Sequence, residues 1–294
     1  ALKPDDAGAH YNLGNALKEQ GRLEEAEASY RKSIKLKPDI DRVHSNLARV
    51  LYKLGYKNSA LKSIENAIDI NPRVKEYELI LSVMKTRKSN EESGVAISDT
   101  SDTDALKELA SSPLILYREV EAGLITSLYG MSFREIDKIN SGILLASGRN
   151  DARYGNGKCS PDFNLFQDSS SIIQKLAEDL TKIMMNAVKS KIFIYDSFFN
   201  ILGAGGGLVP HNHIGELDED IGYNLGKKKY SLVYYLSVGD QDCSQPGVLK
   251  LYEPNEGILP SKGMIMIFPA SRLHSADYGG KTDRVMIGVN FYSL

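Results

Sequence analysis

A 34-residue period runs through the first third of the chain and constrains its fold more than any other feature. Pro4, Pro38 and Pro72 recur at this spacing, and Gly21 and Gly55 follow it as well. Between these markers, further residues repeat in the same register: His10 with His44, Leu13 with Leu47, Leu17 with Leu51, Ala26 with Ala60, and Ile34 with Ile68. A period of this length is typical of stacked helix–turn–helix units, which bury one continuous apolar face.

The period resembles the tetratricopeptide repeat. The matching positions are Leu13, Gly14, Leu17, Ala26, Tyr30 and Pro38, then Leu47, Ala48, Leu51, Ala60, Ala67 and Pro72. The resemblance implies an α-solenoid over residues 1–88, with residues 73–88 as a capping helix and a protein or peptide as its partner. A structural spacer or a dimer contact is the alternative. Because His10 and His44 occupy equivalent repeat positions, packing explains them better than metal binding.

The chain begins with residues that copy the end of a repeat. The segment Leu2-Lys3-Pro4-Asp5 has the same sequence as Leu36-Lys37-Pro38-Asp39. We therefore expect a trimmed piece of a longer array.

Charge separates the repeats from the rest of the chain. Residues 1–88 hold 17 Lys and Arg against 12 Asp and Glu, whereas residues 89–104 hold five acids and no base. The acidic segment is rich in Ser and Asp and lacks aromatic residues, which is typical of a solvated linker. We therefore expect two domains, residues 1–88 and 105–294, joined by a linker over residues 89–104.

The whole composition limits the function classes. The net charge is −2 and 42% of the residues are hydrophobic, which is ordinary for a globular chain and gives no reason to expect nucleic acid as a partner. Apolar runs are shorter than the roughly 20 residues of a membrane helix, and no signal segment opens the chain. The two cysteines, Cys159 and Cys243, lack metal-pair spacing. A cytoplasmic protein without membrane contact is expected.

The second domain combines helices with strands. Residues 170–190 show helical apolar spacing. Short segments rich in β-branched and aromatic residues follow, at Ile192–Leu202, Tyr230–Val238, Gly247–Tyr252, Gly263–Pro269 and Asp283–Tyr292. This pattern favours an antiparallel β-sandwich or jelly roll with helices outside, so the chain as a whole is predicted to be α+β.

Three of the five histidines lie in this second domain. His211 and His213 are two residues apart, which places both imidazoles on one side of an extended chain. His274 follows at the end of a later strand, and Arg284 comes ten residues after it. Imidazole binds iron, copper, zinc and nickel, so the pattern predicts a metal site without choosing the metal.

From about residue 195 onward the chain resembles the iron(II)- and 2-oxoglutarate-dependent dioxygenases of the prolyl-hydroxylase-like branch. The resemblance implies a double-stranded β-helix in which His211 and His274 bind iron(II) and Arg284 grips the distal carboxylate of 2-oxoglutarate. It also assigns Tyr235 to that carboxylate, with Ser231 on the same face of the strand. Asn200 is a further candidate for the oxo-acid, although a role in the strand ladder is equally compatible with its position.

One departure from the family pattern concerns the third ligand. The family has Asp or Glu where this chain has His213. We expect His211, His213 and His274 to bind the metal together. The alternative is that Glu216 or Asp218, which follow on a loop, reaches the metal instead.

Three functional hypotheses follow. The first is an iron(II)/2-oxoglutarate-dependent hydroxylase that uses dioxygen and acts on a protein or peptide recruited by the repeats, with no catalytic side chain beyond the metal ligands. The second is a tetratricopeptide scaffold with a catalytically silent metal-binding β-fold. The third is a cupin-like three-histidine metalloenzyme without 2-oxoglutarate, which would have no reason to bury Arg284.

Overall fold

The computed structural model describes residues 6–93, 109, 111–140, 163–203, 206–215, 217–219 and 224–294. The chain divides into two compact units, Ala1–Thr100 and Ser101–Ser293. Each unit is described by itself below.

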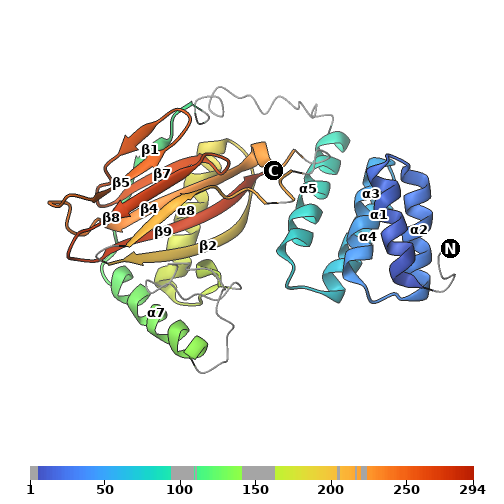
Figure 1. Ribbon diagram of the computed structural model, residues 1–294, viewed down its shortest axis with the longest axis horizontal. Helices are drawn as coiled ribbons and strands as arrows, with labels where there is room; N and C mark the ends of the chain where they lie inside the picture. The colour runs from blue at the N-terminus through green and yellow to red at the C-terminus, as the bar shows by residue number, and fades with distance from the viewer. Residues whose placement is uncertain are drawn as a thin grey trace. The chain divides into compact units, whose positions relative to one another are not determined.

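The first unit consists of antiparallel helix pairs (Figure 1). Its helices are α1 (Ala7–Glu19), α2 (Leu23–Leu36), α3 (Asp41–Lys53), α4 (Lys57–Ile70) and α5 (Lys75–Glu92). Gly21 and Gly55 form the turns inside the two pairs with φ values of +76° and +85°, a backbone conformation that glycine adopts without steric cost. The two glycines that share the 34-residue spacing therefore occupy equivalent turns.

Small residues of the repeat lie where helices approach each other. Ala26 and Ala60, which occupy the same position in successive repeats, are completely buried. Gly14 faces the ring of Tyr30, and a Cβ atom at residue 14 would overlap that ring. The helix pairs therefore pack closely because these side chains are small.

Helix α5 covers the end of the array through apolar residues that are almost fully buried, among them Leu79, Ile80 and Met84. It ends at Glu92, past the predicted domain boundary at residue 88. From residue 94 on, the predicted linker lies outside the described residues.

The second unit contains two antiparallel sheets (Figure 1). The five-stranded sheet has the order β1-β7-β4-β9-β2, and the four-stranded sheet has the order β3-β8-β5-β6. The strands are β1 (Leu114–Tyr117), β2 (Ile192–Leu202), β3 (Gly206–His211), β4 (Lys229–Ser237), β5 (Pro246–Leu251), β6 (Glu256–Ile258), β7 (Met264–Pro269), β8 (His274–Tyr278) and β9 (Arg284–Ser293). From β2 to β9 the chain passes between the sheets at nearly every connection, which is the arrangement of a double-stranded β-helix.

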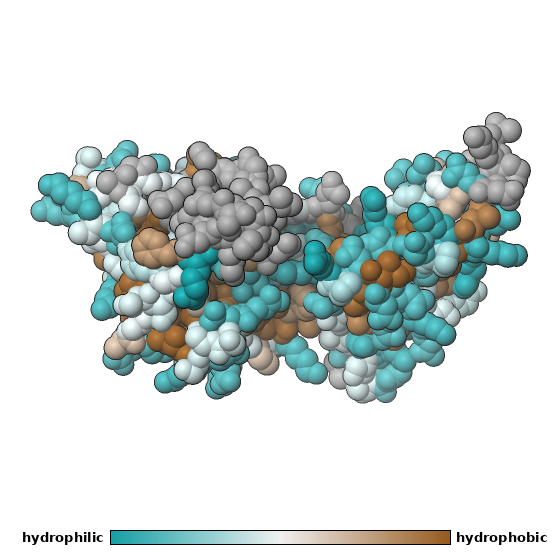
Figure 2. Space-filling view, turned by 90° about the horizontal axis from the view of Figure 1, so that it is seen from below, coloured by the Kyte–Doolittle hydropathy of each residue, from teal (hydrophilic) through white to brown (hydrophobic). Residues whose placement is uncertain are grey.

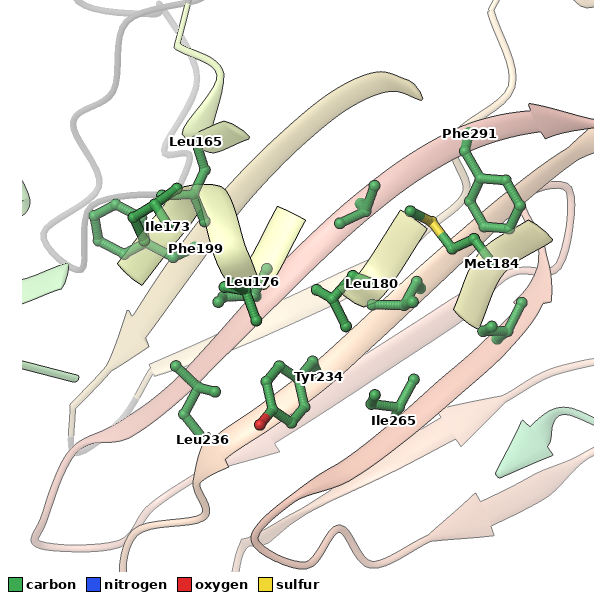
Figure 3. Close-up of a cluster of buried hydrophobic side chains, with 14 of the residues drawn as sticks. Leu165, Ile173, Leu176, Leu180, Met184, Phe199, Tyr234, Leu236, Ile265 and Phe291 are labelled. Atoms are coloured by element: carbon green, nitrogen blue, oxygen red, sulfur yellow. The ribbon is translucent and has the colours of Figure 1, made fainter. Parts of the chain in front are cut away.

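Helices accompany the sheets, as the fold class predicted. They are α7 (Leu124–Asn140) and α8 (Ser171–Val188), together with the short 3-10 helices η2 (Leu165–Gln167) and η3 (Gly226–Lys228). Helix α8 lies across the outer face of the five-stranded sheet (Figure 3). Leu176, Leu180 and Met184 on this helix pack with Tyr234 and Phe291 of the sheet.

Alternation along the strands creates a second face. On β4, Tyr234 points to the α8 side, whereas Tyr235 belongs to a separate apolar cluster that contains residues of both sheets. The same cluster includes Met286 of β9 and Leu249 and Tyr278 of the four-stranded sheet. The space between the two sheets is therefore a distinct interior, and the predicted site residues lie along it.

The surface that is visible in Figure 2 is largely hydrophilic, with apolar residues in separate patches. Among the described residues, no helix combines the length and the apolar character that a membrane crossing requires.

Candidate metal centre

Three histidines converge in the β-helix unit. His211 ends β3 and His274 begins β8, and the two residues pair directly in the antiparallel register of these strands. His213 follows β3, where its backbone N–H donates to the carbonyl of Ala270 at 2.9 Å. One ring nitrogen from each of the three histidines lies within 4.8 Å of those of the other two. This geometry is compact enough for one metal ion.

Two of the imidazoles have a fixed orientation. Nδ1 of His211 lies 2.7 Å from the carbonyl oxygen of Val209, and Nδ1 of His274 lies 3.1 Å from that of Arg272. Because a carbonyl only accepts hydrogen bonds, each Nδ1 carries the proton and each Nε2 keeps a lone pair. A bond from one ring nitrogen to a backbone carbonyl is typical of histidines that bind metals through the other nitrogen.

His274 is the most buried of the three, at 3% exposure. Burial, together with the neighbouring His211, lowers the pKa of His274 to about 4. The imidazole is therefore neutral near pH 7, which is the form that binds a cation. Its ring also packs edge-on against Phe268, in the interior between the sheets. Neutral imidazole donors of this kind suit iron, zinc, copper and nickel alike.

Asp218, the alternative third ligand, is held away from the cluster by other partners. One carboxylate oxygen accepts from the Lys229 ammonium and from the Gly215 N–H, each at 2.8 Å, and the other accepts from the Tyr292 hydroxyl at 2.7 Å. Glu216 lies outside the described residues. Within the part of the chain that the structure describes, the candidate ligand set is therefore the three histidines.

Arg284 lies in the same interior, at the start of β9, and is completely buried. Its guanidinium donates to three backbone carbonyls: Nη1 to Gly247 at 2.5 Å, Nη2 to Pro246 at 2.5 Å and Nε to Val238 at 3.3 Å. The ring of Tyr278 lies 4.6 Å from the guanidinium carbon. No described Asp or Glu forms an ion pair with Arg284. The buried cation is thus stabilised by carbonyl dipoles and by the rings of Tyr278 and Tyr235, the second of which lies 5.9 Å away, and burial lowers the pKa of Arg284.

Two further buried polar side chains lie in the five-stranded sheet. Tyr235 on β4 pairs in register with Met286 on β9, and Met286 pairs with Asn200 on β2, so the three residues form one row across the sheet. Tyr235 and Asn200 are 1% and 5% exposed. Neither the Tyr235 hydroxyl nor the Asn200 amide forms a side-chain hydrogen bond with any described residue. Burial raises the pKa of Tyr235, so its hydroxyl keeps the proton that it needs as a donor.

Ser231 does not join this row. It lies four residues before Tyr235 on β4, about 13 Å away at strand spacing. Its hydroxyl donates to Asn290 at 2.7 Å, and the amide of Asn290 donates to Asp196 at 2.8 Å. Ser231 instead pairs in register with Phe268, which contacts His274. The structure therefore places Ser231 toward the histidines and separates it from Arg284.

Sequence reasoning missed two residues that now stand out. Lys229 is 5% exposed and contacts Asp218, and Arg272 is 6% exposed and supplies the carbonyl that orients His274. Their positions next to predicted strands gave only a weak signal, because a Lys or Arg at a strand end is ordinarily exposed.

Comparisons with known proteins support the repeat assignment. The family model described as "TPR repeat" matches residues 14–55, and the one described as "Tetratricopeptide repeat" matches residues 41–74. No curated protein matches the chain. The tetratricopeptide prediction is therefore confirmed over the matched residues.

Solved structures similar to the chain include three oxygenases. An oxidoreductase of the 2OG-Fe(II) oxygenase family from Burkholderia pseudomallei has a TM-score of 0.40 and 13% identity, covering 64% of this chain and 88% of that chain. A Pseudomonas putida prolyl-4-hydroxylase has a TM-score of 0.41 and 13% identity, covering 65% and 98%. A viral collagen prolyl hydroxylase from Paramecium Bursaria Chlorella virus-1, in a 2OG complex, has a TM-score of 0.36 and 15% identity, covering 44% and 77%.

The TM-scores of all three structures lie below 0.5, so these structural matches are weak. The chain carries tetratricopeptide repeats over residues 14–74 and, in its second unit, a double-stranded β-helix with a three-histidine cluster.

Proposed function

We propose that residues 105–294 form an iron(II)- and 2-oxoglutarate-dependent oxygenase, a hydroxylase whose protein or peptide substrate is recruited by the repeats in residues 1–88. One observation carries this proposal. The interior of a single β-helix holds a cluster of three imidazoles and also a buried arginine that has no carboxylate partner among the described residues. The cluster accounts for a metal, and the arginine accounts for an anionic cosubstrate.

His211, His213 and His274 would hold the metal. Iron(II) bound by three protein ligands keeps open positions for a 2-oxo acid and dioxygen, and so supplies the oxidising chemistry. The overall reaction converts 2-oxoglutarate, dioxygen and a substrate C–H bond into succinate, carbon dioxide and a C–OH group. The chain's own contribution is to orient the ligands through the carbonyls of Val209 and Arg272.

Arg284 would bind the distal carboxylate of 2-oxoglutarate. Each terminal nitrogen of an arginine carries two N–H groups, and a backbone carbonyl accepts from Nη1 and from Nη2. One N–H on each nitrogen therefore remains for a carboxylate, whose charge would compensate the buried cation. The Tyr235 hydroxyl and the Asn200 amide would supply further hydrogen bonds. Ser231, near the histidine end, would contact the opposite end of the cosubstrate.

The repeats would contribute substrate capture. Stacked helix pairs present an extended surface, and protein recognition is the common use of such surfaces. Residues 1–88 carry a surplus of basic residues, which favours an acidic partner segment.

The test is turnover with defined components. Protein loaded with iron(II) should consume dioxygen and release succinate when 2-oxoglutarate is added, and His274→Ala should do neither. His10→Ala, which removes an imidazole from the repeat unit, is the matched control and should retain activity. Metal-loaded wild-type protein that neither binds 2-oxoglutarate nor releases succinate would contradict the proposal.

One observation favours a second function, a metal-binding scaffold without catalysis. The guanidinium of Arg284 is sealed from solvent and already bonded to three carbonyls, so it also has the features of a structural link between β9 and β5. The two functions differ in one measurement: 2-oxoglutarate titrated into the metal-loaded protein should bind in the first case and not in the second.

A further inference from the structure

Asp218 and Lys229 form a buried ion pair next to the metal centre. Their charged atoms lie 2.8 Å apart, and the side chains are 2% and 6% exposed. The Lys229 ammonium also lies over two aromatic rings, 4.9 Å from the centroid of Tyr195 and 5.1 Å from that of Tyr292. Tyr292 in turn donates its hydroxyl to the second carboxylate oxygen of Asp218. Both oxygens of Asp218 are therefore engaged.

This ion pair is connected to His213 from both sides. Asp218 accepts from the Gly215 N–H through its carboxylate and donates its own N–H to the Gly215 carbonyl, which fixes the turn just after His213. The carbonyl of Lys229 accepts from the Ala270 N–H, and the Ala270 carbonyl accepts from the His213 N–H. Lys229 thus holds the His213 segment with its side chain at one end and with its backbone at the other.

Stability alone does not account for such a pair. Apolar residues of similar volume frequently stabilise a protein as well as a buried ion pair does, because both charges must lose their water. The pair instead supplies directional hydrogen bonds. A carboxylate with three fixed donors sets the position of the turn, whereas an apolar contact, which has no preferred direction, would not. The imidazole that needs this position is His213, which lies beyond the end of β3 and lacks a place in the strand register that pairs His211 with His274.

We propose that Asp218 is a positioning residue: paired with Lys229 and Tyr292, it holds the turn after β3 so that His213 meets the other two histidines. The inference rests on the proposed metal site. In this inference Asp218 supports the ligand His213 and is not itself a ligand. Lys229 and Tyr292 contribute to the same support through their bonds to Asp218.

The experiment measures binding of cobalt(II) alone to the full chain. Asp218→Asn keeps the size of the side chain but removes its charge. It should weaken cobalt(II) binding by about 10–100-fold, the usual effect of changing a residue that supports a metal ligand. The double variant Asp218→Asn with Lys229→Met removes the unpaired cation as well and should regain part of this loss. Glu219→Gln, an exposed neighbouring acid, is the matched control and should bind as the wild type does.

Tyr292→Phe covers the case in which Asp218→Asn does not fold. It removes one hydrogen bond to Asp218 but leaves the ion pair in place, so it should give a smaller loss of cobalt(II) affinity in the same direction. Circular dichroism of the metal-free variants confirms that they are folded. The absorption spectrum of bound cobalt(II) should keep its wild-type shape in every variant that still binds, because no ligand has changed.

Wild-type affinity in both Asp218→Asn and Tyr292→Phe would overturn the inference. So would a changed cobalt(II) spectrum in Asp218→Asn without recovery in the double variant, because that result would make Asp218 a ligand. Failure of the proposed metal site is a separate result: His274→Ala would then bind cobalt(II) as tightly as the wild type.

Discussion

Two histidines, one in each unit, are buried to a similar degree but bonded differently. His44 in the helical unit is 8% exposed, and its Nε2 atom bonds to the Pro38 carbonyl. His274 in the β-helix unit is 3% exposed, and its bond to a carbonyl uses Nδ1, which leaves Nε2 beside two further imidazoles. Burial therefore does not distinguish a structural histidine from a candidate ligand. The two further imidazoles beside the remaining nitrogen of His274 do.

The same contrast extends to other polar groups. In the helical unit, the buried hydroxyls of Ser33 and Tyr30 bond to Ala7 and Asn15. In the interior of the β-helix, the Tyr235 hydroxyl and the Asn200 amide have no side-chain partner among the described residues. These two hydroxyls of the helical unit are satisfied within that unit, whereas the Tyr235 hydroxyl and the Asn200 amide of the β-helix are available to a ligand. Four predictions test this comparison.

The largest effect is expected for the histidines themselves. Mutation of a residue that only supports a metal ligand reduces metal affinity by roughly 10–100-fold. His274→Ala should reduce divalent-metal binding by more than this, because it removes a ligand. His44→Ala should leave metal binding unchanged and lower the free energy of unfolding of the helical unit by about 1 kcal/mol, the value of one hydrogen bond. Metal titration and thermal unfolding measure the two effects. Equal metal affinity in both variants would remove the distinction between the histidines.

Arg284→Ala should affect the cosubstrate and not the metal. Truncation of one member of a buried charge pair costs about 2–5 kcal/mol, so half-saturation by 2-oxoglutarate should rise by about thirtyfold to several thousandfold. Arg284→Lys should recover part of the loss, because it restores the charge without the planar fork. Tyr235→Phe removes one hydroxyl and should have a smaller effect. A wild-type 2-oxoglutarate response in Arg284→Ala, with metal content unchanged, would make Arg284 purely structural.

Two glycines allow the same substitution in each unit. Gly247 has a φ of +76°, and a Cβ atom there would overlap the guanidinium of Arg284, whereas Gly14 faces the ring of Tyr30. Each Gly→Ala change should destabilise its own unit by about 1–3 kcal/mol through overpacking. Gly247→Ala alone should also weaken 2-oxoglutarate binding. Calorimetry resolves the two unfolding transitions, and a loss of 2-oxoglutarate binding in Gly14→Ala would show that the effect is not local.

The smallest expected effect is on the stability of the fold at low pH. The guanidinium of Arg118 donates to Glu121 and holds the pKa of that carboxyl below its usual value. Because the folded pKa is depressed, the contribution is present above about pH 4.3, the unfolded value, and disappears as pH falls through the folded pKa. Arg118→Met should therefore remove an ion-pair contribution of about 1 kcal/mol or less at pH 7, and this contribution should be absent at pH 2, where the bonds of Arg118 to neutral groups such as the Tyr234 hydroxyl remain. The exposed Arg22–Glu25 pair of the helical unit is the control, and Arg22→Met should change acid stability little.

Sequence patterns predicted the long elements well. Ile192–Leu202 was predicted as a strand and forms β2 with the same bounds, and the segments that became β4, β5, β7 and β9 were each displaced by only about one residue. These strands carry long β-branched and aromatic runs, and the helices carry the 34-residue period of Leu, Ala, Gly and Pro. Local pattern determines such elements because each of them buries a regular face.

The strands that hold the histidines were not predicted. Strand β3 contains two glycines and Pro210, and β8 begins His274-Ser275 and contains Asp277. Neither has an apolar alternation, because the ligand residues and the turn residues take its place. The spacing of His211 and His213 still indicated the cluster. The role of Asp218 could not be predicted, because it depends on Lys229 and Tyr292 arriving from other strands.

Strand β3 has one consequence for how the fold would respond to metal. It lies at an edge of its sheet, β8 is its neighbour among the described strands, and its register shifts between Leu208 and His211. A metal shared by His211 and His274 would add a second cross-strand link and close the chain between them. By mass action, free metal at a hundred times its dissociation constant adds about 2.7 kcal/mol to the folded state. Amide hydrogen exchange along residues 206–211 would then slow as metal is added, so that this edge strand reports the free metal concentration.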